Sequence, residues 1–155
     1  MHAELGALFA EHREALLGGG LKAALELLEP FWKILRAHIR VEEVLLLPAY
    51  TQRVGRVEGG TAELFLAEHR KMERFVQEFR RTIKRIASRR GPPKRRDILA
   101  LLDREALFLR LMEHHAEREN TFLYALLDRA TTPAERAQAA EAIRRIEVRR
   151  SQIRR

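Results

Sequence analysis

Apolar residues recur every three and four positions along most of the chain, and no stretch sustains the β-branched alternation of a strand. This periodicity predicts an all-α protein. Glycine and proline runs divide the pattern into four segments, expected as helices over residues 3–17, 21–53, 61–88 and 95–129. Short turns favour antiparallel neighbours, so residues 1–130 are predicted to form an up-down-up-down four-helix bundle.

An appended amphipathic, basic helix is expected within residues 131–155. Thr132 and Glu135 have the spacing of a capping box, and Pro133 falls at the first helical position. The apolar side of this helix can pack on the bundle or mediate self-association into a homo-oligomer, and both alternatives stay open. In the second helix, Pro30 is expected to kink or restart the chain and Pro48 to loosen the last turns, because proline lacks a backbone donor.

Two segments of the chain recur in the same order. Residues 11–13 (EHR) return as residues 68–70, and HIRVEEVLLLPAY beginning at His38 resembles HAERENTFLYALL beginning at His115. The second match aligns Glu42 with Glu119. Two matches in the same order indicate a duplicated helix pair.

Each predicted core helix places a histidine on its apolar face, and two of the helices add a glutamate one turn later. These residues are His12, His38, Glu42, His69, His115 and Glu119. A single inward histidine is usually a satisfied core residue, whereas a buried, unpaired carboxylate costs roughly several kcal/mol. A shared cation would satisfy all of them. Because the chain has no cysteine, that cation must be one that imidazole and carboxylate bind, such as iron, manganese or zinc.

The spacing His-x-x-x-Glu sharpens this prediction, because it places two side chains on one helical face. His69 and Glu73 share the spacing, but Glu73 lies beside the apolar seam, where a metal ligand and a surface residue are equally expected. Glu105 is too far from Glu119 to join the same cluster and is expected to pair with an arginine. Tyr50 and Tyr124 follow the two best pairs, where packing is favoured over hydrogen bonding to the site.

The order of these motifs, over roughly residues 8–127, resembles the hemerythrin-like domains of the prokaryotic HHE cation-binding type. The resemblance implies a non-haem di-iron centre bridged by Glu42 and Glu119. Its terminal ligands would be His12 with His38 on one iron and His69 with His115 on the other. Glu73 stands where oxygen-carrying animal hemerythrins have another histidine, which should favour Fe(III) and alter the reaction with O2.

A protein of this kind is expected to bind or react with O2, nitric oxide or peroxide in sensing, storage or detoxification, and no residue is assigned a catalytic role. One alternative is delivery of iron to, or repair of, iron centres in other proteins. Another is a metal-independent helical adaptor that uses its basic surface. These alternatives differ in whether the buried histidines and glutamates are needed for binding.

The chain carries 30 Lys and Arg against 22 Asp and Glu, a net charge of +8. Basic residues gather in residues 84–96 and 144–155, but no nucleic-acid motif accompanies them, so a solvated excess at helix ends is preferred over nucleic-acid binding. No apolar run approaches about 18 residues, and no signal segment is evident. A cytoplasmic protein without membrane association is therefore expected.

Overall fold

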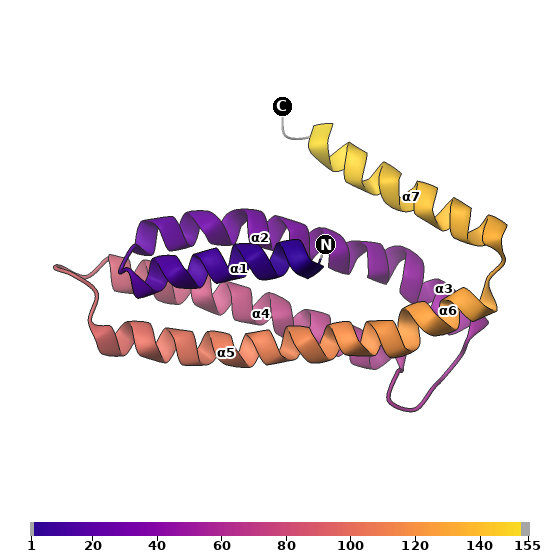
Figure 1. Ribbon diagram of the computed structural model, residues 1–155, viewed down its shortest axis with the longest axis horizontal. Helices are drawn as coiled ribbons and strands as arrows, with labels where there is room; N and C mark the ends of the chain where they lie inside the picture. Colours follow the sequence, from indigo (N-terminus) through magenta and orange to yellow (C-terminus); the bar gives the residue numbers. More distant parts are fainter. Residues whose placement is uncertain (1, 153–155) are drawn as a thin grey trace. The chain divides into compact units, whose positions relative to one another are not determined.

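The computed structural model describes the backbone of residues 2–152 and the side chains of residues 3–143 (Figure 1). Within this part of the chain the regular structure is entirely helical, with no strand. The helices join into five continuous stretches, which confirms the all-α prediction and the expected positions of the turns. The α-helices are α1 His2–Leu17, α2 Leu21–Val41, α3 Leu47–Arg53, α4 Ala62–Ala87, α5 Arg95–Arg118, α6 Ala125–Ala130 and α7 Pro133–Gln152.

Two of the stretches contain a widened, π-helical turn. The first, η1 Glu42–Leu46, joins α2 to α3, and the second, η2 Glu119–Tyr124, joins α5 to α6. The helix α2 continues through Pro30, so no restart occurs there. Pro48 does follow an altered turn: it lacks the N–H that would bond to the carbonyl four residues earlier, and η1 directly precedes it.

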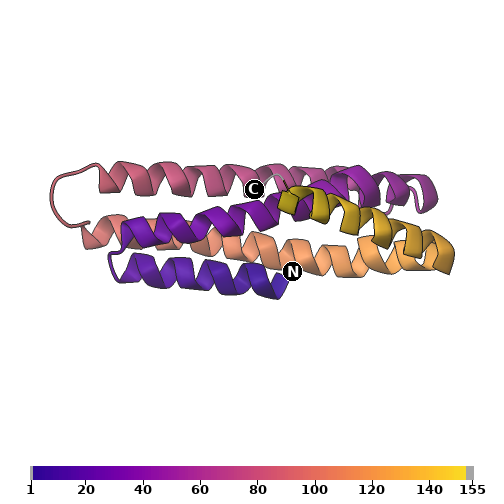
Figure 2. The same ribbon diagram turned by 90° about the horizontal axis from the view of Figure 1, so that it is seen from above.

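The chain divides into two compact units, each assembled from segments distant in the sequence. Unit 1 comprises Met1–Arg36 and Glu68–His114, and unit 2 comprises Ala37–Ala67 and His115–Arg155. The core of unit 1 is a cluster of phenylalanine rings in contact with one another: Phe9, Phe31, Phe75, Phe79 and Phe108. Residues 88–94 connect α4 to α5 in this unit (Figure 2).

Unit 2 has a separate core, formed where α3, α4 and α6 supply apolar side chains. Its buried members are Leu47, Tyr50, Phe65, Leu123 and Leu127. The predicted capping box of α7 is present, because the Thr132 hydroxyl accepts from the Glu135 N–H at 3.3 Å while the Glu135 carboxylate accepts from the Thr132 N–H at 2.8 Å. This contact fixes where α7 begins.

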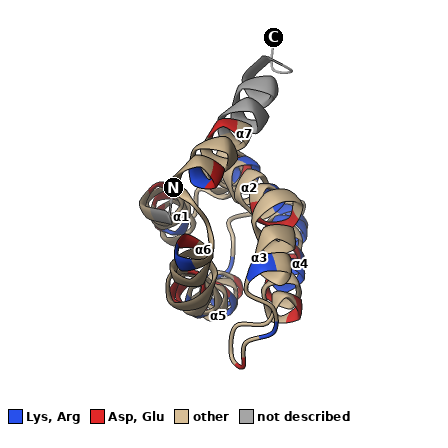
Figure 3. Ribbon diagram, turned by 90° about the vertical axis from the view of Figure 1, so that its right-hand side faces the viewer, with Lys and Arg blue, Asp and Glu red and all other residues tan. Residues whose placement is uncertain are grey.

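Most charged residues in the described part of the chain are exposed. Both signs occur along α4 and α5 (Figure 3). All seven basic residues between 84 and 96 are exposed, and Arg89 pairs with Asp97 at 2.6 Å. The other basic segment, residues 144–155, lies outside the described side chains. Among the described helices, none is long and apolar enough to cross a membrane.

Candidate metal centre

Four of the predicted metal ligands come together in unit 2. One ligand atom from each of His38, Glu42, His115 and Glu119 lies within 4.8 Å of the other three. All four side chains are buried, and both glutamates have no exposed surface. We refer to these four residues as the His/Glu cluster.

The local structure explains why each pair shares a face. His38 lies in the last turn of α2 and Glu42 opens η1, while His115 lies in the last turn of α5 and Glu119 opens η2. The backbone is α-helical up to each glutamate, so residues four apart meet on one side. Each widened turn begins at the glutamate itself and leaves the His-x-x-x-Glu spacing that precedes it intact.

Within the cluster, histidines from both segments converge on one carboxylate oxygen. Glu119 Oε1 lies 3.1 Å from His38 Nε2 and 2.8 Å from His115 Nε2. Glu42 is held less closely, with Oε1 at 3.6 Å from His38 Nε2 and Oε2 at 3.9 Å from His115 Nε2. The cluster therefore joins the two segments that the sequence repeat had aligned.

Electrostatics favour an ionised Glu119. Burial alone would raise the pKa of Glu119, but hydrogen bonds from His115 and His38 stabilise the carboxylate and bring its pKa well below the ordinary value. The buried carboxylate is thus negatively charged at neutral pH. A negative group surrounded by imidazole nitrogens is a suitable environment for a cation.

Two tyrosines near the cluster have different roles. The Tyr50 hydroxyl donates to the Gly60 carbonyl oxygen at 2.8 Å, which is a packing contact of the unit 2 core. The Tyr124 hydroxyl instead donates to Glu42 Oε1 at 2.6 Å. The sequence favours packing for both residues, which is correct for Tyr50 and wrong for Tyr124, whose hydroxyl contacts the cluster.

The fit of a metal to these residues can be judged from their donor atoms. Two imidazoles and two carboxylates, buried and within 4.8 Å of one another, form a nitrogen and oxygen donor set suited to iron, manganese or zinc. Phe65 packs edge-on against His115, with ring centroids 6.1 Å apart. The residues present fit a bound cation.

His12 lies in unit 1, and both of its ring nitrogens make hydrogen bonds there. Nδ1 contacts the Ala24 carbonyl oxygen at 2.7 Å, and Nε2 contacts Glu105 Oε1 at 2.9 Å. Glu105 was expected to pair with an arginine, and Arg13 Nε does lie 3.6 Å from its second oxygen. The closer partner of Glu105 is His12, a pairing that sequence reasoning missed.

The other two predicted ligands also belong to unit 1 and stay predictions. His69 is buried on α4, as its place in the apolar seam indicated. Glu73, one turn later, is half-buried. The sequence places His69 within the apolar seam and Glu73 beside it, and the greater burial of His69 agrees with this placement.

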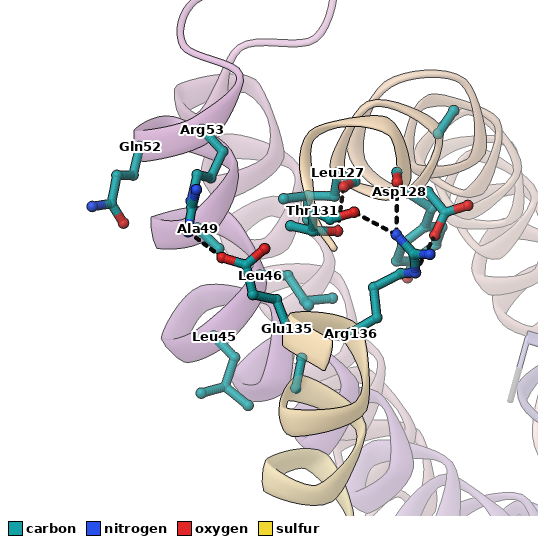
Figure 4. A pocket seen from close by; sticks show the side chains of 13 residues that line it. Leu45, Leu46, Ala49, Gln52, Arg53, Leu127, Asp128, Thr131, Glu135 and Arg136 are labelled. Carbon is teal, nitrogen blue, oxygen red and sulfur yellow. Dashed lines mark hydrogen bonds and ion pairs between the residues drawn. The ribbon is translucent and has the colours of Figure 1, made fainter. Parts of the chain in front are cut away.

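A pocket in unit 2 adjoins the cluster through Tyr124. It has a volume of about 540 Å³ and lies among η1, α3, α6 and α7, with Tyr124 among its lining residues. Figure 4 shows two ion pairs that α7 makes at this pocket, Glu135 with Arg53 of α3 and Arg136 with Asp128 of α6. Apolar side chains of Leu45, Leu46 and Leu127 form much of the remaining wall.

A comparison with protein families gives a match over residues 1–104, to the family described as the hemerythrin HHE cation binding domain. The matched residues include His38 and Glu42, whereas His115 and Glu119 lie beyond them. The resemblance seen in the sequence is confirmed. No curated protein matches the chain, and no solved structure matches it.

Proposed function

Because the chain belongs to the hemerythrin HHE cation-binding family, we propose that it is a non-haem iron protein whose His/Glu cluster holds the metal. The observation that carries this proposal is the cluster itself: two histidines and two glutamates, all buried, with ligand atoms within 4.8 Å of one another. Burying such a set without a cation is costly, since each carboxylate then depends on its neighbours alone.

The proposal extends to a second iron, by analogy with the family pattern. His69 and Glu73 would supply its further ligands, and Glu42 and Glu119 would bridge the two ions. His12, the other ligand that the family pattern implies, would first have to release its hydrogen bonds with Ala24 and Glu105. The up-down-up-down bundle predicted from the sequence would bring the helices into this arrangement. This extension rests on the order of motifs along the chain, and the iron stoichiometry tests it.

We propose that the physiological ligand is a small oxidant, namely O2, nitric oxide or peroxide. When bound, ferrous iron supplies an open coordination position and a reducing electron. The chain supplies the surroundings: buried donors that fix the metal, Phe65 packed against His115, and a hydrogen bond from Tyr124 to Glu42. Such surroundings limit the access of bulk water to the metal.

The proposal is tested by adding ferrous iron to the metal-free protein under anaerobic conditions and measuring bound iron by elemental analysis. About two irons per chain, with a new visible absorption on admitting air, is the expected result. One iron per chain would support the cluster and refute its extension. A folded chain that takes up no stoichiometric metal, with iron, manganese or zinc offered in turn, would refute the proposal.

Adjacent histidines on α5 provide a matched pair of variants. His115 is buried in the cluster, whereas His114 is exposed. His115→Ala should weaken metal binding by more than about 100-fold, because loss of an outer hydrogen-bonding partner already costs about 10–100-fold. His114→Ala should bind as the wild type does. Equal binding by both variants would place the metal elsewhere.

A further inference from the structure

A tyrosine makes a short contact with the His/Glu cluster. The Tyr124 hydroxyl donates to Glu42 Oε1 at 2.6 Å, a short distance typical of a hydrogen bond to an ionised carboxylate. Glu42 opens η1 and Tyr124 closes η2. This hydrogen bond therefore ties together the two widened turns that follow the candidate ligands.

The widened turn is what brings Tyr124 to Glu42. On an uninterrupted α-helix, with about 100° per residue, Tyr124 would point to the side opposite His115. Through η2 each turn takes more residues, so the phenol is rotated toward the cluster. The π-helical turn η2 therefore orients the Tyr124 side chain for its hydrogen bond with Glu42.

The Tyr124 hydroxyl is the donor of this hydrogen bond, since an ionised carboxylate can only accept. Burial raises the pKa of the phenol, and the negative charges of Glu42 and Glu119 raise it further. Because the hydroxyl occupies one oxygen of Glu42, the carboxylate is held in one orientation, with Oε2 on the side of His115.

We propose that Tyr124 is a positioning residue of the candidate metal centre, which acts by holding Glu42 through Oε1 so that Oε2 is presented to the cation. This inference deepens the proposed function and rests on it. An outer hydrogen bond of this kind orients a ligand and tunes its basicity.

Tyr124 has two neighbours that a variant must keep apart. Its hydroxyl contacts Glu42, and the residue also lines the pocket among η1, α3, α6 and α7. Tyr124→Phe removes the hydroxyl and keeps the ring. Tyr50→Phe is the matched control, since it removes a buried hydroxyl in the same unit that donates to Gly60 and not to the cluster.

The experiment is titration of metal-free full-length protein with Co(II), a spectroscopic probe for a nitrogen and oxygen site, at 25 °C and one pH. Tyr124→Phe should raise the Kd for Co(II) by about 10–100-fold and shift the visible d–d bands. Tyr50→Phe should keep the wild-type Kd and bands and lower only the melting temperature. The bands report ligand orientation, which a purely structural role would not alter.

The outcomes separate the inference from the function on which it rests. Wild-type protein that binds no Co(II), iron, manganese or zinc would refute the proposed function, and the inference with it. Wild-type binding with an unchanged Kd and spectrum in Tyr124→Phe would refute the inference alone. Equal weakening in both tyrosine variants would also overturn it, because the effect would then be a general loosening of unit 2.

Discussion

The buried pair of His12 and Glu105 leads to a quantitative prediction. The Ala24 carbonyl oxygen can only accept, so His12 Nδ1 must carry a hydrogen and donate to it at 2.7 Å. Nε2 then faces Glu105 Oε1 at 2.9 Å, and this contact needs a second hydrogen, carried by His12 or by Glu105. The pair is thus a proton-bearing link that ties α1 to α2 and α5.

Substitution of one partner should be costly, because Glu105 would remain buried. Both residues have no exposed surface, and in His12→Leu the carboxylate would retain only Arg13, whose Nε lies 3.6 Å away. Breaking a buried ion pair typically costs about 3–5 kcal/mol. For a chain of this length that lowers the melting temperature by roughly 6–20 °C.

The variants of Glu105 test the reasoning further. Glu105→Gln should be nearly neutral, since its amide can donate to a neutral His12 Nε2. The double variant His12→Leu with Glu105→Leu should lose much less stability than the sum of the single changes, because no charge is then left buried. Thermal unfolding of metal-free protein, followed by circular dichroism, compares the wild type with His12→Leu, Glu105→Leu, the double variant and Glu105→Gln.

The competing role for His12 is that of an iron ligand, and it gives the opposite result. His12→Leu would then leave the stability of the metal-free protein unchanged and reduce the iron bound per chain. Additive effects of the two leucine substitutions, together with lost iron, would refute the reasoning based on the buried pair.

Three further predictions concern stability. The pKa of Glu119 in the folded chain lies below its ordinary value of 4.5, so the unfolded chain takes up the proton first as the pH falls. The metal-free protein should therefore be fully stabilised above about pH 4.5 and lose stability below it. Glu119→Gln should flatten that part of a profile of melting temperature against pH. Gly60→Ala should destabilise by about 1–3 kcal/mol in urea unfolding, because the new Cβ would come within 2.6 Å of Phe122 Cβ. Gly6→Ala, in an exposed position of α1 with open space around it, should instead stabilise by about 0.5–1 kcal/mol, and a loss of stability would contradict the helical assignment there.

The sequence predicted best those structural features that depend on a single local rule. Glycine and proline positions predicted the five helical stretches, because those residues disrupt a helix wherever they fall. The His-x-x-x-Glu spacing identified the four cluster residues, because the backbone is α-helical up to Glu42 and Glu119.

Two features could not be predicted from the sequence: the face on which Tyr124 lies and the partners of His12. Hydrophobic periodicity does not distinguish an α-turn from a π-turn over so few residues, so the face of Tyr124 was not evident. The apolar seam showed that His12 points inward, but not which residues it meets. The turn at Gly18–Gly20 was the available signal: it places the end of α1 beside the start of α2, where Ala24 lies.

The paired widened turns have one more consequence. Each π-turn starts at the glutamate of its repeat, Glu42 in one and Glu119 in the other. A π-turn takes more residues per turn than an α-helix, so every side chain after the glutamate is rotated relative to an uninterrupted helix. The face that α3 and α6 turn toward the core of unit 2 is therefore set by η1 and η2, and cannot be extrapolated from the apolar seam of α2 or α5.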